Sequence, residues 1–185
     1  MKSLAPKYFL ILLLCIFTPG LRAQEQQTYQ FPLDPETKKI FYREVVEEKG
    51  TPAYLYDKAI EWFGYYYLNA QSVLSIQDKP NGRIEGIGRM KIYYQDPSDG
   101  IRRDAGMIQY QVRIELKENR YRYTLTDFNL KGSTRIPIEK WMNKSDPAYN
   151  VRWDTYLFQV DTTMQRLVSS LKEQMKPVVV KKDEW

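Results

Sequence analysis

The chain has 185 residues, of which 43% are hydrophobic and 28% charged, and its net charge is +5. This composition is typical of a globular protein with one domain, and it excludes disordered, collagen-like and disulfide-rich chains. The sequence contains no histidine and a single cysteine. Ser-His-Asp and Cys-His catalytic sites and histidine-bearing zinc sites are therefore excluded.

The N-terminus predicts a signal peptide over residues 1–23. Two lysines precede the ten-residue apolar run 8–17, and a Thr-Pro-Gly break and the small residue Ala23 follow it. A membrane-spanning helix needs about 20 apolar residues, so an uncleaved anchor is the weaker alternative. The order of charge, apolar run and small residue is typical of a cleaved secretory leader. We expect export, cleavage after Ala23, no transmembrane segment after cleavage, and a location in the periplasm or at the cell surface.

Cleavage changes both the charge and the redox chemistry of the chain. Cys15 lies inside the apolar run and follows the bulky Leu14, which does not fit a lipoprotein acylation site. Residues 1–23 contain the single cysteine of the chain and three of its 28 basic residues, but none of its 23 acidic residues. The mature chain, with a net charge of +2, therefore has no thiolate metal site and lacks the basic excess of nucleic-acid-binding proteins.

The first half of the mature chain predicts a strand and a helix. Residues 24–37 are rich in Gln and Pro and indicate an extended leader into a single domain over 38–176. Residues 40–47 are rich in Val, Phe and Tyr, as strands are. Thr51 and Pro52 are a helix-start signal, and apolar residues with helical spacing continue to about Leu68.

Short alternating segments follow, typical of antiparallel strands. Leu74 and Ile76 are predicted to share one face of a strand that ends at an Asn-Gly turn at 81–82. Residues 83–94 alternate between an apolar and a polar side. Gly86 and Gly88 lie on the apolar side, where we expect a trough that receives the ring of Trp62 or Phe63.

The second half predicts two more strands and a long helix. Residues 96–100 form a turn, whose two aspartates lack the twelve-residue loop of a calcium site. Residues 108–116 alternate without fault, and a change of parity after residue 125 indicates a bulge near Thr126 or Asp127. A connection over 131–152 leads to an amphipathic helix over 154–176, stopped by Pro177. The tail 177–185 is read as a short edge strand or a frayed end.

Two segments resemble a known family. Phe31-Pro-Leu-Asp34 leading into Ile40–Val46, and Gly50–Trp62, are similar to the domain of unknown function 4468 family of exported bacterial proteins. The resemblance covers about residues 38–131 and includes Gly86-x-Gly88 and Tyr121-Arg-Tyr123. It implies a TBP-like α+β fold, in which a curved antiparallel sheet of about five strands carries two helices on one face. It also implies a Gram-negative periplasmic or surface location, and it assigns no activity.

The main functional hypothesis is an envelope-associated binding or structural module without catalytic residues, metal or cofactor. With both helices on one face of the sheet, the other face presents long polar and cationic side chains. A cell-envelope protein, a peptide or an anionic glycan is the expected partner, and the competing reading is an ordinary solvated sheet face. The candidate binding residues are Arg89, Lys91, Tyr93, Gln109, Gln111, Arg113 and Arg122.

Two other functions are less well supported. A hydrolase of envelope glycans requires paired carboxylates, for which Glu85, Glu115 and Asp127 are the candidates, each of them also a plausible surface partner of a neighbouring cation. The Ser-x-x-Lys sequence at 169–172 lies late in the last predicted helix and lacks the companion motifs of its enzymes. DNA binding follows from the name of the fold alone, and both export and the charge of the mature chain argue against it.

Overall fold

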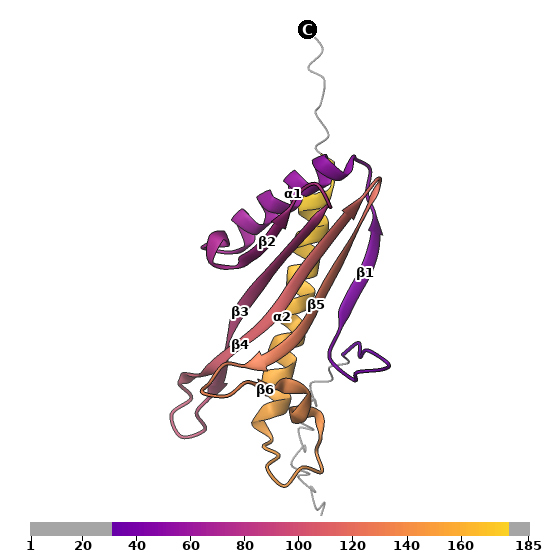
Figure 1. Ribbon diagram of the computed structural model, residues 1–185. Coiled ribbons are helices and arrows are strands. Elements are labelled where there is room, and N and C mark those ends of the chain that lie inside the picture. Colours follow the sequence, from indigo (N-terminus) through magenta and orange to yellow (C-terminus); the bar gives the residue numbers. More distant parts are fainter. Residues whose placement is uncertain (1–30, 178–185) are drawn as a thin grey trace, which may run out of the picture.

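The computed structural model describes residues 31–177 (Figure 1). The predicted signal peptide and most of the C-terminal tail lie outside the described residues. The strands are β1 (Tyr42–Glu47), β2 (Leu74–Asp78), β3 (Arg83–Gln95), β4 (Arg102–Lys117), β5 (Arg120–Leu130) and β6 (Ile136–Pro137). The helices are α1 (Pro52–Tyr66) and α2 (Arg152–Met175), and the short 3-10 turns are η1 (Ala70–Ser72) and η2 (Ile138–Met142).

All the strands form one antiparallel sheet. Its order is β1-β5-β4-β3-β2, and β6 adds to the end of β5. The register aligns Ile84 of β3, Ile114 of β4 and Tyr123 of β5 across the sheet, and all three side chains are buried on the same face. Because successive side chains of a strand alternate between faces, the polar residues between them face the other way. The predicted α+β architecture is thus confirmed.

Both helices cover the apolar face of the sheet. In Figure 1, α2 runs behind the central strands and α1 lies beside it at one end. The buried residues of both helices and of the sheet form one continuous hydrophobic cluster. The indole Nε1 of Trp62 on α1 donates a 3.2 Å hydrogen bond to Ser170 on α2, which fixes the two helices relative to each other. As predicted, Thr51 caps α1 by accepting a hydrogen bond from the amide of Tyr54.

Two of the three register shifts between the described strands bear on the sequence-based predictions. The expected bulge in β5 lies at Asp127, whose φ of +55° is left-handed, and it returns Phe128 to the buried face. A second shift lies between Leu74 and Ile76 in β2, which was not predicted. Leu74 pairs with Gly86 and Ile76 with Glu85, so the two side chains lie on opposite faces. The prediction that they share a face was wrong, because it assumed an unbroken alternation.

The two glycines of β3 accommodate neighbours other than those predicted. A Cβ at Gly88 would overlap the ring of Tyr110 on β4, and a Cβ at Gly86 would approach the carbonyl oxygen of Val73 to 2.9 Å. The expectation that Trp62 or Phe63 fills this trough was therefore wrong. Tyr110 is the cross-strand partner of Gly88, so its ring turns across the strand into the space that the missing side chain leaves.

The segment before β1 is folded back on the domain. Residues 31–37, the described end of the segment expected to be an extended leader, form a tight turn in which Asp34 accepts hydrogen bonds from the amide and the hydroxyl of Thr37. Phe31 is only 7% exposed and packs edge-on against Tyr42. No helix within residues 31–177 is both long and apolar enough to cross a membrane.

Candidate functional site

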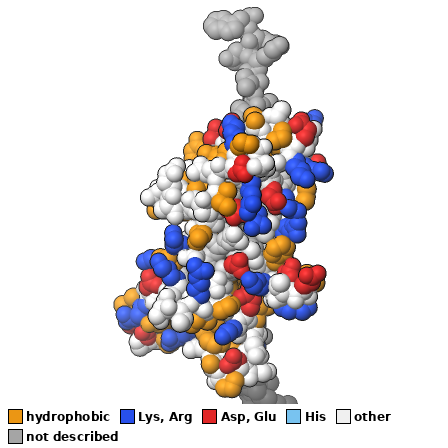
Figure 2. Space-filling view, viewed as in Figure 1, with side chains coloured by type: hydrophobic (Ala, Val, Ile, Leu, Met, Phe, Trp, Pro, Cys, Tyr) orange, Lys and Arg blue, Asp and Glu red, His pale blue; other side chains and the backbone are white. Residues whose placement is uncertain are grey.

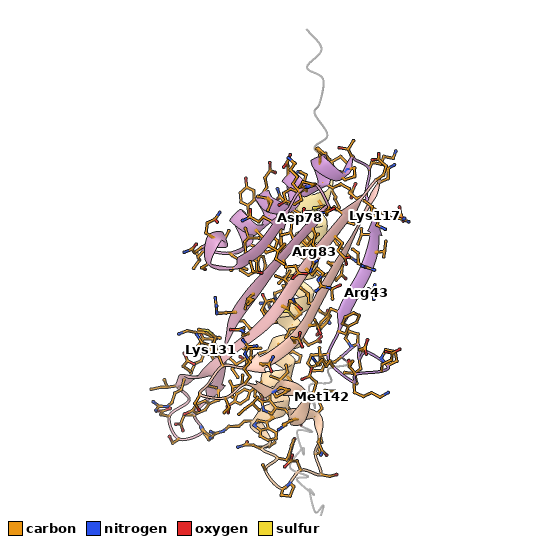
Figure 3. All side chains as sticks on the ribbon, viewed as in Figure 1. Arg43, Asp78, Arg83, Lys117, Lys131 and Met142 are labelled. Carbon is orange, nitrogen blue, oxygen red and sulfur yellow. The ribbon has the colours of Figure 1, made fainter. Side chains whose placement is uncertain are left out.

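The face of the sheet that carries no helix, here called the open face, holds all seven candidate binding residues. Arg89 pairs with Gln109 across β3 and β4, and Arg113 lies opposite Glu85. Arg122 of β5 continues the row beyond Glu115. Figure 2 looks onto this face and shows basic side chains interspersed with acidic ones. Figure 3, in the same view, labels three of the basic residues: Arg83 on β3, Lys117 on β4 and Arg43 on β1.

Glu85 is the centre of the charge pattern on β3 and β4. Its carboxylate accepts hydrogen bonds from the guanidinium groups of Arg83 and Arg113, each at 2.5 Å. The residue is only 6% exposed although it lies on the open face. Burial by itself raises the pKa of this carboxyl, but the two guanidinium groups outweigh that effect and hold the pKa below its ordinary value. Arg113 is thus committed to an internal ion pair.

Two further candidate cations are neutralised in the same way. Arg122 forms a two-pronged hydrogen bond to Glu115, with both distances 2.7 Å, and Lys91 lies 3.0 Å from Asp104. The ring of Tyr93 is covered by the guanidinium of Arg102 at 3.7 Å from its centroid. The register therefore converts much of the predicted cationic row into cross-strand ion pairs, a pattern that sequence parity alone does not reveal.

Arg89 differs from the other candidate cations. Within the described part of the chain it forms no ion pair, and its cross-strand partner is Gln109, which lines a hollow of about 370 Å³. The hollow on the open face is lined by Ile87, Gln109, Tyr110, Gln111, Asp127, Asn129 and Arg135. It brings together two of the candidate residues, Gln109 and Gln111, with an asparagine and an arginine that sequence reasoning missed.

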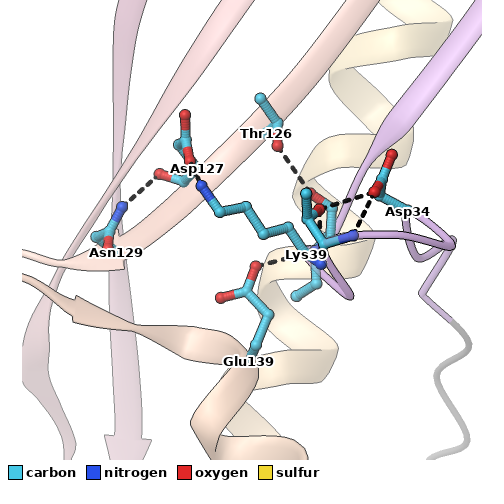
Figure 4. Close-up of polar contacts among 8 residues, drawn as sticks. Asp34, Lys39, Thr126, Asp127, Asn129 and Glu139 are labelled. Carbon is cyan, nitrogen blue, oxygen red and sulfur yellow. Dashed lines mark hydrogen bonds and ion pairs between the residues drawn. The ribbon is translucent and has the colours of Figure 1, made fainter.

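The wall of this hollow is fixed by contacts at the β5 bulge (Figure 4). Lys39 donates to Asp127 at 2.5 Å, and the side-chain amide of Asn129 donates to the carbonyl oxygen of Asp127 at 2.7 Å. The hydroxyl of Thr126 donates to the carbonyl oxygen of Ile40, whose own amide donates to Glu139 at 2.9 Å. Residues 39–40, themselves bound to Glu139, therefore hold the bulge in place, so the hollow is preformed.

The residues that sequence reasoning missed left only a weak signal. The change of parity near Asp127 correctly predicted the bulge, but it gave no indication that Asn129 faces the same hollow as Gln109. Arg135 lies in the connection to β6, a strand of two residues that is too short to leave a periodic pattern. A smaller hollow of about 260 Å³ lies at the other end of the open face, between Val45, Lys117 and Arg120.

The carboxylates considered for a hydrolase are all engaged by cations. Glu85 is held by two arginines, Glu115 by Arg122, and Asp127 by Lys39. A general acid needs a carboxyl with a raised pKa, whereas that of Glu85 is lowered. In the Ser-x-x-Lys sequence, the hydroxyl of Ser169 donates a hydrogen bond to a carbonyl oxygen of its own helix, and Lys172 donates a 2.6 Å hydrogen bond to Glu44. These positions therefore do not provide hydrolytic chemistry.

Comparisons with known proteins agree with this architecture. Residues 41–131 match the family described as a domain of unknown function (DUF4468) with TBP-like fold. A crystal structure of a DUF4468 family protein from Bacteroides ovatus is similar at a TM-score of 0.55 and 18% identity, covering 82% of this chain and 94% of that one. No curated protein matches the sequence.

A second solved structure is also similar. It is a TBP-like protein from Parabacteroides distasonis, with a TM-score of 0.52 and 14% identity over 77% of this chain and 97% of that one. At these identities the likeness concerns the fold and assigns no activity. The match over residues 41–131 identifies this part of the chain as a member of the family of domains of unknown function (DUF4468) with TBP-like fold.

Proposed function

We propose that the protein is an exported, non-catalytic binding module of the bacterial envelope that binds an acidic glycan in the hollow on the open face. The observation that carries the proposal is that side-chain amides line this hollow together with Arg135, and that Arg89 lies across the strands from the lining residue Gln109. Neither arginine forms an ion pair within residues 31–177. Elsewhere on the open face, Lys91, Arg113 and Arg122 are each neutralised by a carboxylate.

The chemistry of these groups fits a sugar that carries a carboxylate. The amides of Gln109, Gln111 and Asn129 each offer both donors and an acceptor, which suits hydroxyl groups that need both. An arginine presents a planar fork of donors that matches a carboxylate in a two-pronged hydrogen bond. Ile87 adds an apolar surface for the carbon face of a sugar ring. The bulge contacts hold the wall in place before a ligand arrives, which lowers the entropy lost on binding.

The binding experiment uses oligogalacturonate as the acidic probe and a neutral galactose oligomer of equal length as its comparison, with titration calorimetry as the readout. We expect the acidic oligomer to bind the wild-type protein and the neutral one to bind more weakly. The double variant Arg89→Ala/Arg135→Ala removes the two guanidinium groups beside the hollow. Because hydrogen bonds to charged groups contribute about 1.5–3 kcal/mol, its affinity should fall about tenfold or more.

The control removes the same charge elsewhere. Arg43→Ala/Arg166→Ala takes one exposed arginine from β1 and one from α2, neither of which lines the hollow. This control should bind as the wild type does. An equal loss in both double variants would indicate attraction by net charge alone, and no binding of either oligomer to the wild type would overturn the proposed ligand.

Export rests on the sequence of the first 23 residues and is tested separately. N-terminal sequencing of the protein recovered from the periplasmic and membrane fractions of its host should begin at Gln24. An intact N-terminus recovered from the cytosol would overturn the envelope location without affecting the binding site.

A further inference from the structure

A second cavity, separate from the open face, lies at the end of the molecule where β3 and β4 meet η2 and the start of α2. This is the lower end in Figure 1. Its volume is about 490 Å³, which is within the usual range of small-molecule sites. None of the candidate binding residues lines this cavity, and it shares no lining residue with the hollow on the open face. The connection 131–152 forms much of its wall.

The inner wall of this cavity, here called the aromatic pocket, is apolar. Trp141 is 3% exposed and lies nearly parallel to Trp153, with ring centroids 6.1 Å apart and an angle of 24° between the planes. Tyr156 packs against Trp141 at 5.8 Å. Leu130 and the fully buried Ile92 complete this wall from the sheet. A ligand that reaches this depth meets rings and aliphatic side chains.

The polar groups lie at the mouth. Lys140 and Arg152 are both exposed and line the pocket, and Lys140 forms no ion pair within the described residues. The guanidinium of Arg152 lies over the ring of Tyr94 at 4.5 Å, within electrostatic reach of Asp96, and it forms no ion pair within residues 31–177. Asp146 is the one acidic group that lines the pocket, and its Oδ1 accepts from the amide of Ala148 at 2.8 Å. The mouth is therefore cationic on balance.

We propose that the aromatic pocket binds an amphipathic carboxylate, a medium-chain fatty acid, with its alkyl chain along Trp141 and Trp153 and its carboxylate at Lys140 and Arg152. Apolar burial drives the chain inward, and the two cations fix its direction. A sugar has hydroxyl groups on all sides and would lose hydrogen bonds against the apolar inner wall. A neutral lipid would leave the two cations without a partner.

The probe is 12-bromododecanoate, whose bromine quenches the fluorescence of an indole that it touches. The protein has four tryptophans, of which Trp141 and Trp153 line the pocket. We expect saturable quenching of the wild-type protein. Dodecanoate should reverse this quenching by competition, and dodecanol should compete at least tenfold less well. Trp153→Phe should reduce the quenched amplitude. Trp62→Phe, which removes an indole outside the pocket, should leave the quenching in place.

Two variants test the location and the head group. Ala148→Trp places a large ring at an exposed loop position on the pocket wall, so it fills the pocket without disturbing the core. Because neither acid can then enter the pocket, quenching that dodecanoate reverses should be abolished. Lys140→Met/Arg152→Met should weaken binding at least about tenfold, because both charged hydrogen bonds to the carboxylate are lost. Arg43→Met/Arg166→Met, which removes one exposed cation from β1 and one from α2, is the charge-matched control and should bind normally.

The outcomes separate the alternatives. Equal competition by dodecanol and dodecanoate, or normal binding by the Lys140→Met/Arg152→Met variant, would overturn the anionic ligand. Unchanged quenching and displacement in Ala148→Trp with a native circular dichroism spectrum would overturn the location. Absence of quenching in the wild type would overturn the proposal entirely. Binding of oligogalacturonate at the open face is independent of each of these results.

Discussion

The hydroxyl of Tyr42 on β1 donates a 2.6 Å hydrogen bond to the carboxylate of Asp161 on α2, and both side chains are buried. The second carboxylate oxygen accepts from Gln165 at 3.2 Å. This contact joins the edge strand to the long helix, across 119 positions of the chain. Because a buried carboxylate requires donors, the pair specifies how β1 docks against α2.

Tyr42→Phe should lower the free energy of unfolding by about 1–3 kcal/mol, because it leaves one oxygen of the buried Asp161 carboxylate without its donor. Urea denaturation followed by circular dichroism measures this change. The matched comparison is Tyr121→Phe. The Tyr121 hydroxyl is buried and has no hydrogen-bond partner among the described residues, so its removal should be neutral or stabilising. Equal destabilisation by both variants would contradict the role of the Tyr42–Asp161 pair.

Alkaline pH should destabilise the fold through tyrosines whose pKa is raised in the folded state, and five of them have the largest shifts. Burial raises the pKa of Tyr42, Tyr67, Tyr110, Tyr121 and Tyr123 above the ordinary value of 10.0. Below pH 10 these groups are protonated in both states. As the pH rises further, the unfolded chain releases protons that the folded chain retains, so the unfolding free energy falls. Urea titrations between pH 8 and 11 should show this fall. Tyr42→Phe should make it shallower, whereas the exposed Tyr65→Phe should not.

Glu85→Gln should destabilise the protein by about 1–3 kcal/mol at neutral pH, because it removes the buried charge that two arginines share. Glu118→Gln, at an exposed turn position, is the control and should have little effect. The lowered pKa of Glu85 gives the sign of the acid dependence. Its contribution is present above the ordinary pKa of 4.5 and is lost as the pH falls through the lower folded value. The wild type should therefore lose more stability on acidification than Glu85→Gln, and parallel acid limbs would contradict this assignment.

Gly88→Val should lower the unfolding free energy by about 1–3 kcal/mol, because the new side chain meets the ring of Tyr110 in a filled core. Gly64 on α1 offers the opposite case, since a Cβ there meets nothing within 4 Å. Gly64→Ala should raise stability by up to about 1 kcal/mol, because alanine favours the helix interior. Thermal denaturation of both variants is the measurement. A neutral Gly88→Val would show that Tyr110 can turn away.

Much of the fold could be predicted from the sequence because it depends on local patterns. Thr51 and Pro52 marked the start of α1, the unbroken alternation over 108–116 marked β4, and the change of parity after residue 125 located the bulge at Asp127. Each of these signals extends over only a few neighbouring residues. Local propensity and side-chain alternation act on that scale, so one sequence is enough to detect them.

The candidate sites depend on contacts between distant residues, and here the sequence was insufficient. Parity correctly placed the cationic residues on one face, yet only the register showed that Glu85 neutralises Arg113 and that Arg89 has no ion pair within the described residues. The glycines of β3 indicated a close approach, but Tyr110 rather than Trp62 makes it.

The sequence by itself determined the identity and order of β1–β5, α1 and α2 and the polar character of the open face, because these follow from spacing along the chain. The tertiary structure decided which charges cancel, where the hollow and the aromatic pocket lie, and how the connection 131–152 lines that pocket. Strand register and loop path bring together residues that are far apart in sequence, and short-range periodicity carries no information about such contacts.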